Sequence, residues 1–209
     1  MVDRVKIVRK HTATSGEPLY YRSRNVNWMR VYVPQGSELL EASGFERPSE
    51  KFFEEPGKDW NIHSRLQEQY RNTDYHRESG TRIYPEQEKT VFANWTILDP
   101  GETNVIYFKY KLPFKLQDKD QNKEPQPWWR KWGERIVSPQ EQSKKVAYSL
   151  MVQKQAGSEA DTINSFLKKP SKWRSVWKYP DRLKVSEKGW NVSEKLDRDK
   201  YWAAVLEKE

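Results

Sequence analysis

The chain has 209 residues, of which 33% are charged, 35% hydrophobic and 13% aromatic. This aromatic content excludes a disordered chain, because disordered segments are poor in aromatic residues, and the absence of cysteine excludes disulfides and thiolate metal sites. Cations and anions number 7 and 2 in residues 1–30, 9 and 14 in 31–110, and 22 and 14 in 111–209, for a net charge of +8. The chain is thus a polar protein with a basic end, and its charge does not require nucleic acid as a partner.

The beginning of the chain, MVDRVKIVRK, enters a strand-like pattern almost at once and lacks the apolar segment of a signal peptide. No apolar run approaches the roughly 18 residues that a membrane-spanning helix requires. We therefore expect the chain as given to be soluble, and the pattern is compatible with a fragment that carries an added start methionine.

Residues 27–44 predict two short strands around a Pro-Gln-Gly turn. On the first strand an apolar set alternates with a set that contains an arginine and two aromatic residues; the apolar set is Met29, Val31 and Val33, and the other is Trp28, Arg30 and Tyr32. Residues 45–88 and 117–145 are polar and lack such alternation, so both are predicted to be long insertions.

Residues 90–114 predict a hairpin with Pro100 and Gly101 at its tip. In the register that this turn implies, six side chains share one face, which we expect to be core; they are Val91, Ala93, Trp95, Ile106, Phe108 and Tyr110. The opposite face, which includes Phe92, is mixed and expected to be half-exposed. Two-residue hairpins favour primed turns, whereas Pro-Gly suits a type II turn. A loop that is one or two residues longer is therefore an alternative.

Two further segments alternate with period 2: residues 146–158, with Tyr148, Leu150 and Val152, and residues 172–180, with Trp173, Ser175, Trp177 and Tyr179. Residues 158–169 and 197–208 are the only stretches with a helical pattern, and the second is equally compatible with a closing strand. Short strands separated by Pro and Gly predict a mainly β protein. We expect a single antiparallel β-sandwich domain over residues 1–209, with the two insertions and little helix.

Three blocks resemble, in the same order, the C-terminal region of a bacterial cell-envelope protein family of unknown function; they are NWMRVYVPQGSELLEASGF (27–45), KTVFANWTILDPGETNVIYFKYKLPFKL (89–116) and YSLMVQKQAGS (148–158). The resemblance covers about residues 1–206. Members of that family have an N-terminal membrane-spanning helix and a large extracytoplasmic domain before this β-rich tail. The resemblance implies an extracytoplasmic tail that lacks its anchor, and it implies no reaction. The length of residues 117–145 departs from the family.

Residues that carry chemistry show few suggestive spacings. The three histidines, His11, His63 and His76, have no partner at metal-ligand spacing, and no nucleophile, phosphate-loop or dinucleotide motif occurs. A weaker, enzymatic hypothesis places a paired-carboxylate site for glycans among Glu54, Glu55 and Asp59. Asp118 and Asp120 superficially resemble a calcium loop, but its glycine and final glutamate are missing. We predict no catalytic residues, metal or cofactor.

The segment PWWRKW contains the first candidate binding surface: Trp128, Trp129, Arg130, Lys131 and Trp132. It lies between prolines and Gly133, so the adjacent tryptophans cannot all belong to one regular core strand. Three interpretations remain open: a lid on the sandwich, a contact with a partner protein or an anionic membrane surface, and a stacking surface for sugars or bases.

The second candidate is an anion-binding strip; it consists of Lys168, Lys169, Lys172, Arg174 and Lys178. In strand geometry Arg174, Val176 and Lys178 are expected to face away from Trp173 and Trp177. The alternative, which we favour, is an edge strand on which charges discourage aggregation.

The sequence thus predicts a non-catalytic, extracytoplasmic domain of a bacterial envelope protein with a structural or adhesive role. The alternative is a binding module for cell-wall glycan or another anionic polymer. Envelope proteins, cell-wall glycan and anionic membrane surfaces are the expected partners, and nucleic acid is not.

Overall fold

The computed structural model describes residues 1–14, 16–54, 57–114, 145–156 and 161–208. These residues form several antiparallel sheets with little helix, which confirms the predicted mainly β class. The chain divides into two compact units, residues 1–115 and 116–209, where a single domain was expected. Each unit has its own hydrophobic core. Alternation along a strand indicates that one face is buried, but it does not indicate in which core that face lies.

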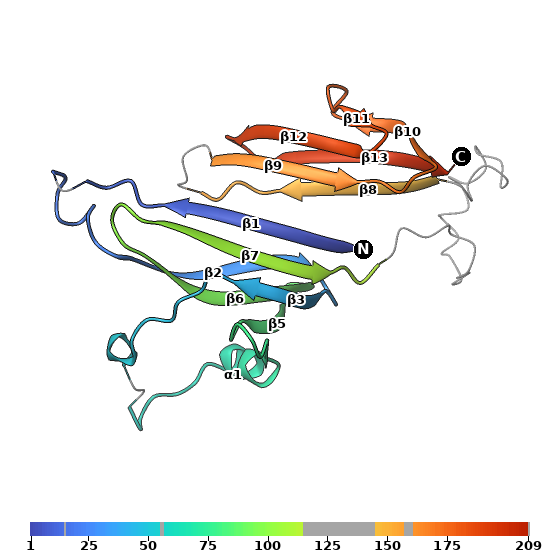
Figure 1. Ribbon diagram of the computed structural model, residues 1–209. Coiled ribbons are helices and arrows are strands. Elements are labelled where there is room, and N and C mark those ends of the chain that lie inside the picture. Colours follow the sequence, from blue (N-terminus) through green and yellow to red (C-terminus); the bar gives the residue numbers. More distant parts are fainter. Residues whose placement is uncertain (15, 55–56, 115–144, 157–160, 209) are drawn as a thin grey trace. The chain divides into compact units, whose positions relative to one another are not determined.

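Unit 1 forms two antiparallel sheets (Figure 1). Its strands are β1 (Val2–Lys10), β2 (Asn25–Pro34), β3 (Glu38–Ser43), β4 (Asp74–Tyr75), β5 (Arg82–Glu86), β6 (Lys89–Leu98) and β7 (Thr103–Lys111). One sheet has the strand order β1-β7-β3 and the other β2-β6-β5-β4. The buried core they share contains Val33, Leu39, Phe92, Ile106, Phe108, Tyr110 and Leu112. From β2, Val33 belongs to this core, and Met29 and Val31 pack against it.

The predicted hairpin of residues 90–114 is wrong, although its turn is present. The Glu102 N–H donates to the Asp99 carbonyl at 3.1 Å, and Gly101 has φ of 83°. However, β6 pairs with β2 and β5, while β7 pairs with β1 and β3. A Pro-Gly turn of this kind does not match the twist of a two-stranded hairpin. It leads the chain from one sheet into the other.

The buried residues of β6 face both ways, which corrects the predicted core. Val91 and Ala93 are buried as expected, but they form a cluster with Tyr84 on the opposite side from Phe108. Phe92, expected on a half-exposed face, is fully buried in the shared core, 6.2 Å from the Phe108 ring. A strand that is covered on both faces gives no alternation of burial from which to choose the inner face.

The predicted insertion at 45–88 contains regular structure. It holds the 3-10 helix η1 (Glu50–Phe52) and the α-helix α1 (Ser64–Arg71), followed by β4 and β5. Strand β5 is part of the four-stranded sheet, and α1 packs beside it (Figure 1). The second predicted insertion, residues 117–145, lies outside the described residues except for its last residue. In the part of the chain that is described, no helix is long and apolar enough to cross a membrane.

Unit 2, like unit 1, forms two antiparallel sheets. Each of them has three strands, and the strand orders are β10-β13-β8 and β11-β12-β9. Its strands are β8 (Lys145–Val152), β9 (Asp161–Lys168), β10 (Trp173–Tyr179), β11 (Val185–Ser186), β12 (Gly189–Leu196) and β13 (Lys200–Lys208). The core contains Leu183, Trp190, Val192, Trp202, Ala204 and Leu206. The strand predicted from the alternation of Tyr148, Leu150 and Val152 is β8, and these three side chains pack against the core.

The two segments with a helical pattern are strands β9 and β13. Trp202, Ala204 and Leu206 of β13 point into the core with period 2, and β13 pairs with strands on both sides. Tertiary pairing and burial therefore outweigh the helix propensity of its Ala, Leu and Lys residues. For residues 197–208 the alternative of a closing strand is confirmed.

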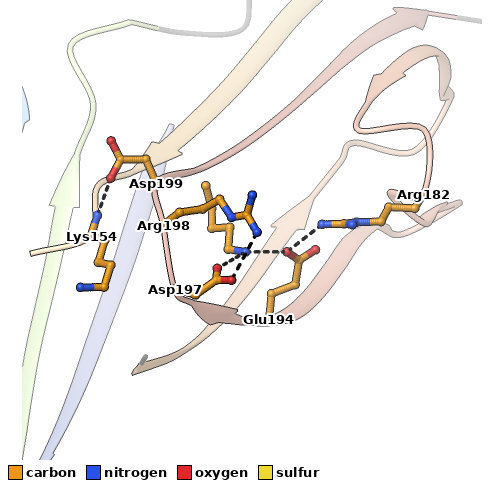
Figure 2. A network of polar contacts seen from close by, with 7 residues as sticks. Lys154, Arg182, Glu194, Asp197, Arg198 and Asp199 are labelled. Carbon is orange, nitrogen blue, oxygen red and sulfur yellow. Dashed lines mark hydrogen bonds and ion pairs between the residues drawn. The ribbon is translucent and has the colours of Figure 1, made fainter. Parts of the chain in front are cut away.

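Charged groups join the β12–β13 corner of unit 2, where the chain passes from one sheet to the other (Figure 2). Glu194 contacts Arg182 at 3.3 Å and Lys200 at 3.7 Å, and Lys200 also contacts Asp197 at 2.7 Å. The hydrogen bond from Lys200 holds the pKa of Asp197 below its ordinary value. Both of these acids, Glu194 and Asp197, face a cation, so we assign the network to the corner rather than to a ligand.

Candidate functional site

The tryptophan-rich candidate, Trp128, Trp129, Arg130, Lys131 and Trp132, lies outside the described residues. Its role in binding stays a prediction.

The alternation predicted for the basic strip holds for Trp173 and Arg174, but it is wrong after a bulge in β10 between Ser175 and Trp177. The extra residue reverses the alternation. As a result Trp177 is 52% exposed while Lys178 is half-buried, the opposite of the expected arrangement. Trp173 packs against the unit 2 core as expected.

Two cations of the strip are already engaged. Arg174 contacts Glu207 at 2.5 Å, and Lys169 donates to the Trp173 carbonyl. Lys168 ends β9 and Lys172 precedes β10, in different sheets of unit 2. Since β10 lies at the edge of its sheet, the favoured interpretation of a charged edge strand fits the described structure better than an anion-binding strip.

The histidines make local hydrogen bonds. The His11 ring contacts the Ser23 carbonyl at 3.0 Å, His63 caps α1 by accepting from the Arg65 N–H, and the His76 ring contacts Ser79. Among the described residues, no group of three or more His, Asp or Glu side chains could hold a metal ion. Of the acids in the enzymatic hypothesis, Glu54 and Asp59 are exposed and Glu55 lies outside the described residues.

The best candidate is the outer face of the β2-β6-β5-β4 sheet, which we call the arginine–aromatic face. The strand registers place its side chains in rows across the sheet. One row pairs Trp28 with Trp95, the next contains Arg30, Ala93, Arg82 and Tyr75, and the third contains Tyr32, Val91 and Tyr84. Aromatic rows therefore border a row that carries two guanidinium groups.

Arg82 is the central charge of this face. Its guanidinium carbon lies 5.2 Å from the centre of the Trp28 ring and 5.9 Å from that of Tyr75, so it contacts aromatic rings from two strands. To reach Trp28, Arg82 extends from β5 past Ala93 of the intervening β6, and the small Ala93 side chain is fully buried. No carboxylate lies within ion-pair distance of Arg82 among the described residues.

Arg30, in contrast, has its charge matched. It contacts Glu86 at 3.3 Å, and the Tyr32 hydroxyl donates to the same carboxylate at 3.2 Å. Nearby on the same face Tyr84 is buried, and its pKa is raised because burial disfavours the phenolate. Glu86 thus neutralises Arg30, whereas Arg82 has no acid partner in the described part of the chain.

Aromatic contacts continue beyond β6. Trp28 and Trp95 lie 4.9 Å apart between ring centres, and Phe53 meets Trp95 edge-on at 5.6 Å. Arg47 lies over the Phe53 ring at 5.6 Å and pairs with Glu50. The face is thus an extended row of half-exposed rings rather than a closed pocket.

Chemically, the face offers flat apolar surfaces together with one guanidinium, Arg82, that no acid matches among the described residues. Such a surface suits a ligand with an apolar ring face and an anionic group, because the guanidinium can donate two hydrogen bonds to a carboxylate or phosphate. The alternation of Trp28, Arg30 and Tyr32 is visible in the sequence. Arg82 and Tyr75 were missed because they lie in the predicted insertion.

Comparison of this chain with known protein families, with curated proteins and with solved structures gave no match.

Proposed function

We propose that this chain is a non-catalytic adhesive domain of a bacterial envelope protein, and that it binds an acidic glycan on the arginine–aromatic face. The envelope location rests on the three sequence blocks described above. The single observation that carries the ligand class is Arg82, a cation without an acid partner in the described part of the chain, held between two aromatic rings.

The pairing of charge and rings favours an acidic glycan over a neutral one. A sugar ring can rest its C–H face on Tyr75, which is 58% exposed, while its carboxylate accepts hydrogen bonds from Arg82. The extended row of rings toward Trp95 and Phe53 suits a polymer, because successive residues can contact successive rings. Many weak contacts along a chain give the avidity that adhesion needs.

Replacing Arg82 with Gln is expected to weaken binding to polygalacturonate about tenfold, since a charged hydrogen bond is lost at the ligand. Binding is measured by calorimetry beside the methyl-esterified polymer, which keeps the sugar rings without the charge. Arg82→Lys should retain only part of the affinity, because an ammonium group lacks the planar donor pair.

The matched control is Arg77→Gln, which removes an exposed arginine from the loop between β4 and β5 and so changes the net charge equally. It should bind like the unaltered protein. Equal losses in the two variants, or equal affinity for the acidic and esterified polymers, would contradict an Arg82 site.

Nucleic acid is the competing anionic polymer, because arginine and aromatic side chains also stack on bases. We expect any retention on single-stranded DNA to vanish near physiological ionic strength, since binding by phosphate neutralisation weakens steeply with salt. The measurement is a salt titration of DNA binding by fluorescence anisotropy. Tight, sequence-selective binding at physiological salt would overturn the envelope proposal.

A further inference from the structure

A second surface lies on the other sheet of unit 1, at the strand β1. β1 pairs with β7 along its whole length of 9 residues, and it is the outermost strand of the order β1-β7-β3. Among the described residues no strand pairs with its other side. A long, regular edge of this kind can accept a further strand.

The pairing with β7 shows which backbone groups remain for such a strand. The Met1 carbonyl accepts from the Leu112 N–H, and the His11 N–H donates to the Glu102 carbonyl. Met1 and His11 flank β1 on either side, and both have odd numbers. In an antiparallel pair these positions alternate, so the N–H and C=O groups of Arg4, Lys6 and Val8 point away from β7.

The exposed side chains of β1 belong to the same even-numbered residues, and three of them are cations: Arg4, Lys6 and Lys10. In the described structure none has a carboxylate at ion-pair distance. The neighbouring lysines of β7 differ, because Lys109 pairs with Glu41 and Lys111 with Glu38. As far as the described residues show, the uncompensated positive charge of this sheet face therefore lies along its β1 edge.

The inner side of β1 is incompletely covered. Val5 and Ile7 pack against the unit 1 core, yet they are only half-buried. An added strand would bring its own inner side chains beside them and extend the core. Apolar residues are required at those positions of the added strand.

We propose that the free edge of β1 binds an extended acidic segment of a partner protein by adding it as a strand. The segment alternates acidic side chains, opposite Arg4 and Lys6, with apolar side chains beside Val5 and Ile7. Oppositely charged cross-strand pairs stabilise such pairing. A second copy of β1 does not fit, because its own cations would lie opposite these cations.

The test measures binding of the full chain to a fluorescent synthetic peptide of the same length as β1, alternating Glu with Val or Ile. Saturable binding is expected, together with new β-sheet signal in isotope-edited infrared spectra. A peptide with Lys in place of Glu should not bind. Binding by both peptides, or by neither, would overturn the proposal.

The decisive variant is Lys6→Pro. Proline removes the Lys6 N–H that faces the free edge, while the β1–β7 hydrogen bonds lie on odd residues, so this edge position tolerates it. Affinity for the acidic peptide should fall about tenfold. Lys6→Ala removes the same charge but keeps the N–H, and should cost only a few-fold.

Two measurements guard against other causes. An acidic peptide N-methylated along one edge should lose binding to the unaltered protein, which tests the backbone contact without any change in the fold. Equal affinities of Lys6→Pro and Lys6→Ala would reduce the edge to a simple basic patch and overturn strand addition. Preferential binding to anionic phospholipid vesicles over the acidic peptide would do the same.

Discussion

Replacement of Phe108 by Ala is expected to lower the free energy of unfolding by about 3–5 kcal/mol. Phe108 is fully buried on β7, the central strand of its sheet. Its ring lies 5.3 Å from Phe45, which follows β3, and 6.2 Å from Phe92 on β6 of the other sheet, so truncation removes both contacts. The cavity left behind adds to the lost transfer free energy, because close-packed neighbours collapse only partly.

The matched control for this substitution is Val105→Ala on the same strand, where the side chain is 43% exposed. A surface change of this kind is expected to cost about 0.5 kcal/mol or less. The free energy of unfolding of both variants is measured by urea unfolding, with hydrogen exchange resolved by segment as the probe of unit 1. Similar losses of unfolding free energy in the two variants would contradict the placement of Phe108 in the core.

Burial of the central strands could be predicted from the sequence, but their pairing could not. Ile106, Phe108 and Tyr110 alternate, and all three are buried. The Pro100–Gly101 turn was also identified correctly, because these residues favour its dihedral angles. Yet the same turn sequence occurs whether the next strand stays in the sheet or crosses to the other sheet. The predicted pairing of β6 with β7 is therefore wrong.

Single-residue irregularities were equally hidden. The bulge at Val176 contains no glycine or proline, so nothing in the local sequence indicates the reversal of Trp177 and Lys178. The same holds for β13, whose Ala and Leu residues suit a helix equally well until the pairing partners on both sides are known.

The candidate site shows the same limit. Trp28, Arg30 and Tyr32 follow one another at alternate positions, and the sequence shows that they share a face. Arg82 joins them only because β5 lies beside β6 and the small Ala93 lets its side chain pass. Contacts between strands more than 50 residues apart in sequence depend on topology, which periodicity does not encode.

Replacement of Trp202 by Ala is expected to destabilise unit 2 by about 3–5 kcal/mol and to leave unit 1 nearly unchanged. Trp202 is almost fully buried on β13, the central strand of its sheet, and packs in the cluster with Trp190 and Leu206. Because unit 1 has its own core, the lost packing should stay local.

Hydrogen exchange resolved by segment measures this effect in the full chain: protection should fall in residues 145–152 and 189–208 and persist in 89–111. The control is Trp177→Ala, which truncates the same side chain on the neighbouring strand where half of it is exposed, and protection should change little. Two separate cores predict two separable transitions, because burial of apolar surface couples only residues that share it. A loss of protection that spreads equally over both units would show that they unfold together. The expectation of a single domain would then describe the unfolding of the chain better than the division into two units.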